Sequence, residues 1–187
     1  MKRTETALPG VCLLDPVVYG DERGFFLESY NRETFARIGI ACPFVQDNHS
    51  RSGRGVLRGL HYQLGRPQEK LVRVIQGEVY DVAVDVRLGS PTFGRCVAER
   101  LDAARRRMMF IPRGFAHGIY VLSESAEILY KCSDVYVPSE ERGIAWNDPG
   151  LAIAWPLVSP DPILSPRDRA WKTLAAQSPA DLPINGR

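Results

Sequence analysis

Short apolar runs, separated by turn residues, recur along the whole chain. Val, Ile, Tyr and Phe are frequent in these runs, and pairs such as Pro9-Gly10 and Gly20-Asp21 separate them. Many short strands at this spacing are typical of a β-sandwich or barrel. The pattern therefore predicts an all-β fold, with strands over residues 11–18, 25–29, 44–48, 56–60, 71–75, 79–86, 95–101, 107–111, 116–122, 126–137 and 151–155.

Only two segments have helical character. Residues 32–38 follow Asn31, a good N-cap, and a second short helix is expected after Ser165. Residues 175–187 are rich in Pro, Ser, Ala and Gly, so we expect a loosely held tail there. The length of 187 residues fits a single domain spanning residues 1–187.

The segment from Val79 to Val86 alternates clearly. Tyr80, Val82, Val84 and Val86 share one face, and the other face carries Asp81 and Asp85 beside Val79 and Ala83. Two aspartates would be costly in a dry core. They suit the mouth or lumen of a barrel that binds something polar, although a solvent-facing sheet surface gives the same pattern.

Composition and charge exclude several classes of function. The chain is 44% hydrophobic and 25% charged, as in an ordinary globular protein, and its net charge of +2 provides no field for nucleic acid or a membrane surface. The sequence shows neither an apolar signal core nor a run long enough to span a bilayer. The four cysteines form no CxxC pair, so we expect reduced thiols and a cytoplasmic protein.

The segment Val56-Leu-Arg-Gly-Leu-His-Tyr-Gln63 carries the strongest chemical hypothesis. In strict alternation Arg58 and His61 point to opposite faces, but Gly59 permits a bulge that aims both inward. An imidazole and a cation in one pocket can take a proton from a carbon acid and hold the resulting charge. The alternative is a half-buried histidine that bonds a backbone carbonyl. A base also needs an orienting carboxylate, and spacing does not choose among Asp81, Asp85 and Asp168.

Other candidate chemistry is weaker on the residues alone. Tyr130 shares a face with Ile128 and Cys132, and is either a buried tyrosine or a general acid facing a histidine base. His61 and His117 lack the His-x-His pair of a cupin metal site, so no metal is expected. No phosphate loop or dinucleotide motif is present, but Arg23 and Arg58 could hold a diphosphate.

Taken together, the chain from about Pro9 to Asp168 resembles the dTDP-4-dehydrorhamnose 3,5-epimerase family. The resemblance rests on nine segments that occur in the right order and spacing: Gly20-Asp-Glu-Arg-Gly-Phe-Phe-Leu-Glu28, Phe44-Val-Gln-Asp-Asn-His-Ser50, Val56-Leu-Arg-Gly-Leu-His-Tyr-Gln63, Lys70-Leu-Val-Arg73, Gly77-Glu-Val-Tyr-Asp-Val-Ala-Val-Asp85, Ser90-Pro-Thr-Phe-Gly94, Ile111-Pro-Arg-Gly-Phe-Ala-His-Gly118, Leu129-Tyr-Lys131 and Trp146-Asn-Asp148.

The resemblance implies a jelly-roll, cupin-like barrel with short flanking helices, acting as a homodimer with no metal and no cofactor. It implies that the substrate is dTDP-4-dehydro-6-deoxy-D-glucose, whose product feeds dTDP-L-rhamnose synthesis. By the same resemblance His61 is the base, Tyr130 the acid and Asp168 the carboxylate that orients the histidine. Lys70 and Arg58 correspond to the cations around the developing enolate.

The resemblance also implies a set of substrate-binding positions: Tyr19, Arg23, Glu28, Gln46, Asp47, Asn48, Arg58, His117, Glu141 and Arg167. Two of them depart from the family pattern. Arg167 replaces a common lysine, which keeps the charge and changes the geometry, and Tyr19 replaces a common phenylalanine. Three alternatives stay open: an epimerase of one carbon only, a sugar ketoisomerase on the same barrel, which the ordered match disfavours, and a sugar-nucleotide-binding barrel without catalysis.

Overall fold

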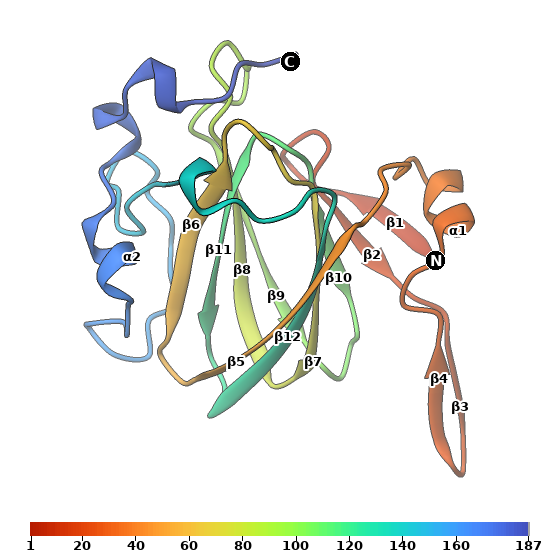
Figure 1. The fold of residues 1–187 in the computed structure, drawn as a ribbon. Helices are drawn as coiled ribbons and strands as arrows, with labels where there is room; N and C mark the ends of the chain where they lie inside the picture. The colour runs from red at the N-terminus through yellow and green to blue at the C-terminus, as the bar shows by residue number, and fades with distance from the viewer. Residues whose placement is uncertain (187) are drawn as a thin grey trace.

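Two antiparallel sheets build the body of the protein, in a computed structural model that describes residues 1–186 (Figure 1). The first sheet has the order β1 (Lys2–Glu5), β2 (Cys12–Asp15), β10 (Met108–Ile111), β7 (Lys70–Gln76), β12 (Ser125–Cys132) and β5 (Gln46–Gly53). The second has the order β13 (Glu141–Gly143), β6 (Leu57–Gln63), β11 (Phe115–Val121), β8 (Glu78–Asp85) and β9 (Cys96–Asp102). The prediction of an all-β, jelly-roll-like barrel with short helices is confirmed.

The space between the two sheets holds the main core. Val72, Val74 and Met109 of the first sheet pack there with Ala83 and Val121 of the second. These positions are the inward-facing halves of alternating strands, since successive side chains of a strand point to opposite faces. One end of the same interior remains hollow and carries the site described below.

The two aspartates of β8 lie inside the protein, and both are fully buried. Asp81 faces the barrel interior. Asp85 ends the strand and accepts hydrogen bonds from Arg87, Ser90 and Thr92, so it holds the following loop. The solvent-facing alternative for these aspartates is therefore wrong.

Two further apolar layers lie outside the sheets. Helix α1 (Arg32–Arg37), capped by Asn31 as predicted, buries Phe35 against the first sheet. On the second sheet, Val82 and Val84 pack under the C-terminal segment, together with Leu174 and Leu182. This segment contains helix α2 (Pro166–Ala170) and the short helices η2 (Leu174–Ala176) and η3 (Pro179–Asp181). A further short helix, η1 (Pro138–Glu140), precedes the segment in the chain.

The structure differs from the expected loosely held tail after residue 175. Leu182 is buried, the Tyr62 hydroxyl donates to the Asp181 carbonyl at 2.8 Å, and Arg142 pairs with the Asp181 carboxylate at 2.8 Å. Sequence composition concealed this docking because one leucine and one aspartate, Leu182 and Asp181, supply these contacts. The C-terminal segment from α2 onward therefore forms a strap across the second sheet (Figure 1).

Several strand limits also differ from expectation. Pro16 separates β2 from β3 (Val18–Asp21), which pairs with β4 (Gly24–Leu27) in a hairpin that projects from the body (Figure 1). Residues 151–155 form no strand, and the Trp155 indole instead donates to the Trp146 carbonyl. The strands β1 and β13 were not predicted. No helix among residues 1–186 is long and apolar enough to cross a membrane.

Candidate active site

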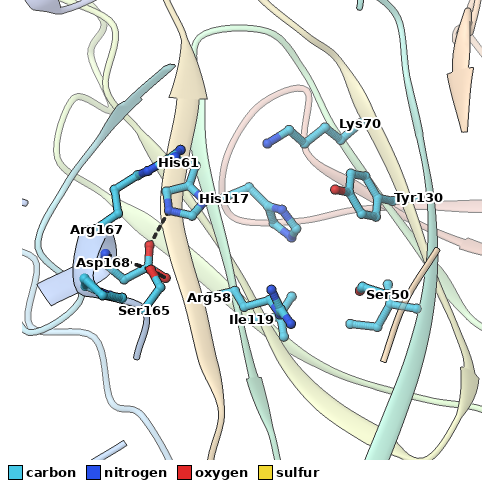
Figure 2. Close-up of a pocket in the computed structure, with 12 residues that line it drawn as sticks. Ser50, Arg58, His61, Lys70, His117, Ile119, Tyr130, Ser165, Arg167 and Asp168 are labelled. Atoms are coloured by element: carbon cyan, nitrogen blue, oxygen red, sulfur yellow. Dashed lines mark hydrogen bonds and ion pairs between the residues drawn. The ribbon is translucent and has the colours of Figure 1, made fainter. Parts of the chain in front are cut away.

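A cavity of about 530 Å³ opens between the two sheets. Side chains of β5, β6, β7, β11 and β12 form its walls, and helix α2 closes one side (Figure 2). The lining residues are Ser50, Arg58, His61, Lys70, His117, Ile119, Ile128, Tyr130, Ser165, Pro166, Arg167 and Asp168. Five of the residues that the sequence singles out for chemistry therefore share one space: His61, Tyr130, Asp168, Lys70 and Arg58.

The predicted irregularity at Gly59 brings Arg58 and His61 into this cavity together. Gly59 has φ +127°, and the pairing of β6 with β11 shifts there, so that His61 lies opposite His117 while Arg58 lies opposite Ile119. A Cβ on Gly59 would lie 2.5 Å from the Gly118 Cα atom. Only glycine fits this close approach in this backbone conformation.

Of the three candidate carboxylates, Asp168 is the one that contacts His61. The His61 Nε2 atom lies 2.5 Å from Asp168 Oδ1. Asp168 occupies the first turn of α2, where the N-cap Ser165 donates its hydroxyl to Asp168 Oδ2 at 2.8 Å. Burial alone would raise the Asp168 pKa, but hydrogen bonds from His61, Ser165 and the Gly59 backbone hold that pKa below its usual value. An ionised Asp168 that accepts the Nε2 proton leaves Nδ1 of His61 as the basic nitrogen.

Tyr130 faces His61 from the other wall of the cavity (Figure 2). It lies on β12, in the sheet opposite to that of His61. Burial raises the pKa of the phenol, and Cys132 and Tyr136 raise it further while Arg58 lowers it. A raised pKa keeps the hydroxyl protonated at neutral pH, so Tyr130 can donate a proton.

Lys70 enters the same cavity from β7, and its ammonium makes no hydrogen bond or ion pair with the described residues. Burial lowers the pKa of its ammonium, while Cys132 and Asp81 partly oppose that shift. A cation held in a partly dry pocket without a protein anion is costly unless a ligand supplies negative charge. Lys70 is therefore suited to an oxyanion that forms during a reaction.

His117 has a carboxylate of its own. Its Nε2 atom lies 2.9 Å from Asp81 Oδ1, and Asp81 is fully buried with no partner on Oδ2 among the residues described. Asp81, one of the three carboxylates that spacing left open for His61, thus orients the neighbouring histidine. Arg58 is held by a hydrogen bond from its Nε atom to the Ser52 hydroxyl at 2.9 Å.

A second cavity, of about 260 Å³, adjoins the first and shares His61, Lys70 and Tyr130 with it. Gln46, Asn48, Tyr136 and Glu141 line it. The Gln46 amide donates to Asn48 at 2.9 Å and accepts from the Tyr136 backbone at 2.8 Å. Glu141 binds the Tyr136 hydroxyl at 3.1 Å and pairs with Arg167. Four predicted substrate-binding residues therefore lie at this mouth: Gln46, Asn48, Glu141 and Arg167.

Four other predicted positions lie away from both cavities. Asp47 points to the opposite face of β5 from its neighbours Gln46 and Asn48, and binds the Lys131 ammonium at 2.7 Å. The strict alternation of β5 is the physical reason, since one face alone can line the barrel. Tyr19 and Arg23 lie on the projecting hairpin, where Arg23 pairs with Asp21, and Glu28 follows the hairpin and accepts from Asn31.

Sequence reasoning missed three contributors to the site: Ser165, Tyr136 and Trp171. Ser165 has a recognisable signal, because Ser165-Pro166-Arg167-Asp168 is a helix-capping pattern that fixes the acidic residue in the first turn. Trp171 has no local signal, because its contact to His61 is tertiary. Tyr136 lies five positions before Glu141 and outside any helix or strand, so no periodic pattern marks it.

The arrangement fits proton transfer at carbon next to a carbonyl group. A histidine–carboxylate pair supplies a base, a protonated phenol on the far wall supplies an acid, and a lysine supplies positive charge between them. Among residues 1–186 no three His, Cys, Asp or Glu side chains lie together as a metal centre would need.

Comparison with known proteins agrees with this chemistry. Residues 5–176 match the family described as dTDP-4-dehydrorhamnose 3,5-epimerase. The protein of that name from Pseudomonas aeruginosa is 59% identical over 176 residues, which cover 94% of this chain and 97% of that protein.

Solved structures agree as well. The dTDP-6-deoxy-D-glucose-3,5-epimerase of Legionella pneumophila, in complex with dTDP-4-keto-L-rhamnose, has a TM-score of 0.96 at 49% identity and covers 100% of this chain and 99% of that chain. A 3'-monoepimerase from Streptomyces bikiniensis, in complex with dTDP-quinovose, has a TM-score of 0.89 at 37% identity and covers 96% and 91%. On its sequence and its fold, this chain belongs to the dTDP-4-dehydrorhamnose 3,5-epimerase family.

Proposed function

We propose that this enzyme inverts C3 and C5 of dTDP-4-dehydro-6-deoxy-D-glucose and releases dTDP-4-dehydro-L-rhamnose, with His61 as base and Tyr130 as acid. One observation carries the proposal: the His61–Asp168 pair and Tyr130 face each other across a single cavity (Figure 2). Inversion requires a proton to leave one face of a carbon and another to arrive on the opposite face. A base and an acid on opposite walls meet that requirement.

The C4 ketone makes the C–H bonds at C3 and C5 acidic, because the carbanion delocalises onto the carbonyl oxygen. His61 takes the proton at Nδ1, while Asp168 stabilises the imidazolium through Nε2. The electron pair moves onto the C4 oxygen, where Lys70 offsets the negative charge. Tyr130 then donates its proton to the opposite face of the carbon, and solvent reprotonates the phenolate while His61 releases its proton. Each acid–base group contributes a factor of about 10²–10⁴.

The second cavity suits the nucleotide diphosphate end of the substrate. It adjoins the reaction cavity and carries the polar side chains Gln46, Asn48 and Glu141. Arg167 stands at its edge, paired with Glu141, and a guanidinium binds phosphate oxygens in a bidentate manner. Residues alone do not identify thymine, and the proposed dTDP group follows the names of the similar proteins.

A second candidate is an epimerase of one carbon only, because the 3'-monoepimerase from Streptomyces bikiniensis shares this fold at 37% identity. The two candidates separate in one experiment. The enzyme is incubated with the keto sugar nucleotide in D₂O, and NMR follows deuterium at both carbons. Exchange at C3 and C5 supports the double epimerase, exchange at one carbon supports the alternative, and exchange at neither refutes both.

We also propose a homodimer in which the hairpin β3–β4 completes the partner's site. Tyr19, Phe25 and Phe26 are 57–69% exposed on this hairpin, an unusual amount of aromatic surface to leave in water. The turn of this hairpin carries Arg23, and the hairpin projects away from the body of its own chain (Figure 1). The partner cavity would gain the predicted contacts of Tyr19 and Arg23 with the substrate.

Mixed dimers test this arrangement. H61N and R23A variants, each inactive as a homodimer, should regain turnover when unfolded together and refolded, because one site of each mixed dimer keeps both residues. No recovery in a mixture shown by mass spectrometry to contain mixed dimers would refute sharing of the site.

The nucleotide-sugar substrate and the four free cysteines favour the cytoplasm as the location of this enzyme.

A further inference from the structure

We infer that Trp171 is a positioning residue for the base, an inference that rests on the proposed role of His61. Trp171 directly follows α2 and stands three positions after Asp168. Its ring lies 6.2 Å from the His61 ring, centroid to centroid, at an interplanar angle of 66°. Asp168 therefore holds His61 through a nitrogen, while Trp171 holds the same ring through an edge-to-face contact.

The backbone of β13 is shaped to receive this indole. Gly143 lies directly opposite His61 in the β13–β6 ladder. A Cβ atom on Gly143 would lie 2.3 Å from Trp171 Cε2 and 2.5 Å from Cδ2 and Nε1. The indole thus occupies the space that a side chain at position 143 would fill. Because Gly143 does not adopt a positive φ, this contact is the feature of the structure that requires a glycine.

Hydrogen bonds hold the backbone next to the indole. The residue after it, Lys172, accepts a backbone hydrogen bond from Ala145 at 2.9 Å. Gln177 donates to the carbonyls of both Gly143 and Lys172 at 3.1 Å. These bonds fix the backbone beside Trp171, and its Nε1 atom is buried without an acceptor among the described residues. Packing of the half-buried ring against Gly143 and His61, and not a hydrogen bond, explains its place.

Helix α2 has only five residues, and so short a helix has little stability of its own. Its position, and with it the position of Asp168, depends on what anchors its ends. Ser165 caps the beginning, and Trp171 anchors the end against Gly143. The indole consequently controls both the rotation of the His61 ring and the approach of the carboxylate that activates it.

Steady-state kinetics of W171A and W171F test the inference. A misplacement of about 1 Å at a reacting group can cost about 10²-fold in rate. W171A should therefore lower kcat by about 10- to 100-fold with KM within twofold, and W171F, which keeps an aromatic edge, should recover most of kcat. W155F is the matched control, since Trp155 packs on Tyr80 and Tyr120, away from His61, and should keep full kcat. A W171A enzyme with kcat within twofold of wild type would overturn the inference.

A double-mutant cycle with D168N separates positioning from mere stability. If Trp171 acts through the pair, W171A should cost much less in the D168N background than in wild type. Independent, multiplying losses would contradict the inference. If W171A does not fold, G143A is the substitute: it should displace the indole and lower kcat in the same way, and full activity of G143A would count against us. An active H61N enzyme would instead refute the proposed base, whatever Trp171 does.

Discussion

His61 and His117 lie directly opposite each other on β6 and β11, and each ring binds a buried carboxylate of its own. Asp168 reaches His61 from the strap outside the barrel, whereas Asp81 reaches His117 from within. Both rings line the cavity that Tyr130 enters from the opposite sheet (Figure 2). Under the function proposed above, we expect the two pairs to divide the work: His61 moves the proton, and His117 holds the sugar.

This division predicts different kinetic effects for two isosteric substitutions. Asp168→Asn should lower kcat by about 10²–10⁴-fold, because the imidazolium loses its counter-charge. Asp81→Asn should mainly raise KM, by about 10- to 100-fold, because a hydrogen bond to a charged group contributes about 1.5–3 kcal/mol. Steady-state kinetics on the keto sugar nucleotide checks both. Asp85→Asn is the control: its carboxylate is equally buried but bonds only the loop after β8, so kcat should stay unchanged.

Tyr130→Phe should separate exchange from inversion. His61 and the Lys70 cation that stabilises the enolate remain, so deuterium should still enter the sugar next to the ketone. Formation of the inverted product should fall by about 10²-fold or more. NMR in D₂O measures both quantities in one sample. Inversion at the wild-type rate in this variant would mean that another group delivers the proton.

Lys70→Met should abolish turnover and stabilise the protein. The pKa of Lys70 is lowered in the folded state, so the unfolded chain binds this proton more tightly. The free energy of unfolding of wild type therefore rises with pH from the lowered pKa up to the usual value near 10.5. Lys70→Met should lose that rise and gain about 1–2 kcal/mol at neutral pH. Urea unfolding at several pH values decides, and a destabilised K70M protein would show that the ammonium is well solvated.

Gly59→Ala should destabilise the protein by about 2–4 kcal/mol, through the strained φ and the clash with Gly118. Any folded fraction should lose activity, because Arg58 and His61 would no longer share one cavity. Gly53→Ala is the matched control on β5, where an added Cβ meets nothing within 4 Å. Thermal unfolding and kinetics of the two variants give the comparison.

The pattern of apolar residues predicted most strands, because each inward-facing half of a strand is apolar. A bulge near Gly59 was also expected to be possible, because a glycine between Arg58 and His61 permits one. Strand β13 could not be predicted, because its three residues, Glu141 to Gly143, are too few to show an alternating pattern.

The site was predictable where chemistry and strand face coincide, as for His61 and Tyr130. The partner of His61 was not predictable from spacing, because three aspartates were equivalent until the fold placed one on α2. Asp47 could have been excluded, since the alternation of β5 turns it away from Gln46 and Asn48. Trp171 could not be identified from the sequence, because the ring that it contacts lies 110 positions earlier in the chain.

His61 and its carboxylate are 107 positions apart in the chain, and the carboxylate arrives on a segment that embraces the barrel from outside. During synthesis on the ribosome, the barrel can therefore form before Asp168, the partner of the proposed base, has been synthesised. Every barrel strand precedes α2 in the chain, so the last step of folding is the docking of the strap, which brings Asp168 to His61 and completes the proposed base. Substitutions in the strap, on the outside of the barrel, could accordingly change the reaction rate without changing the residues that line the barrel interior.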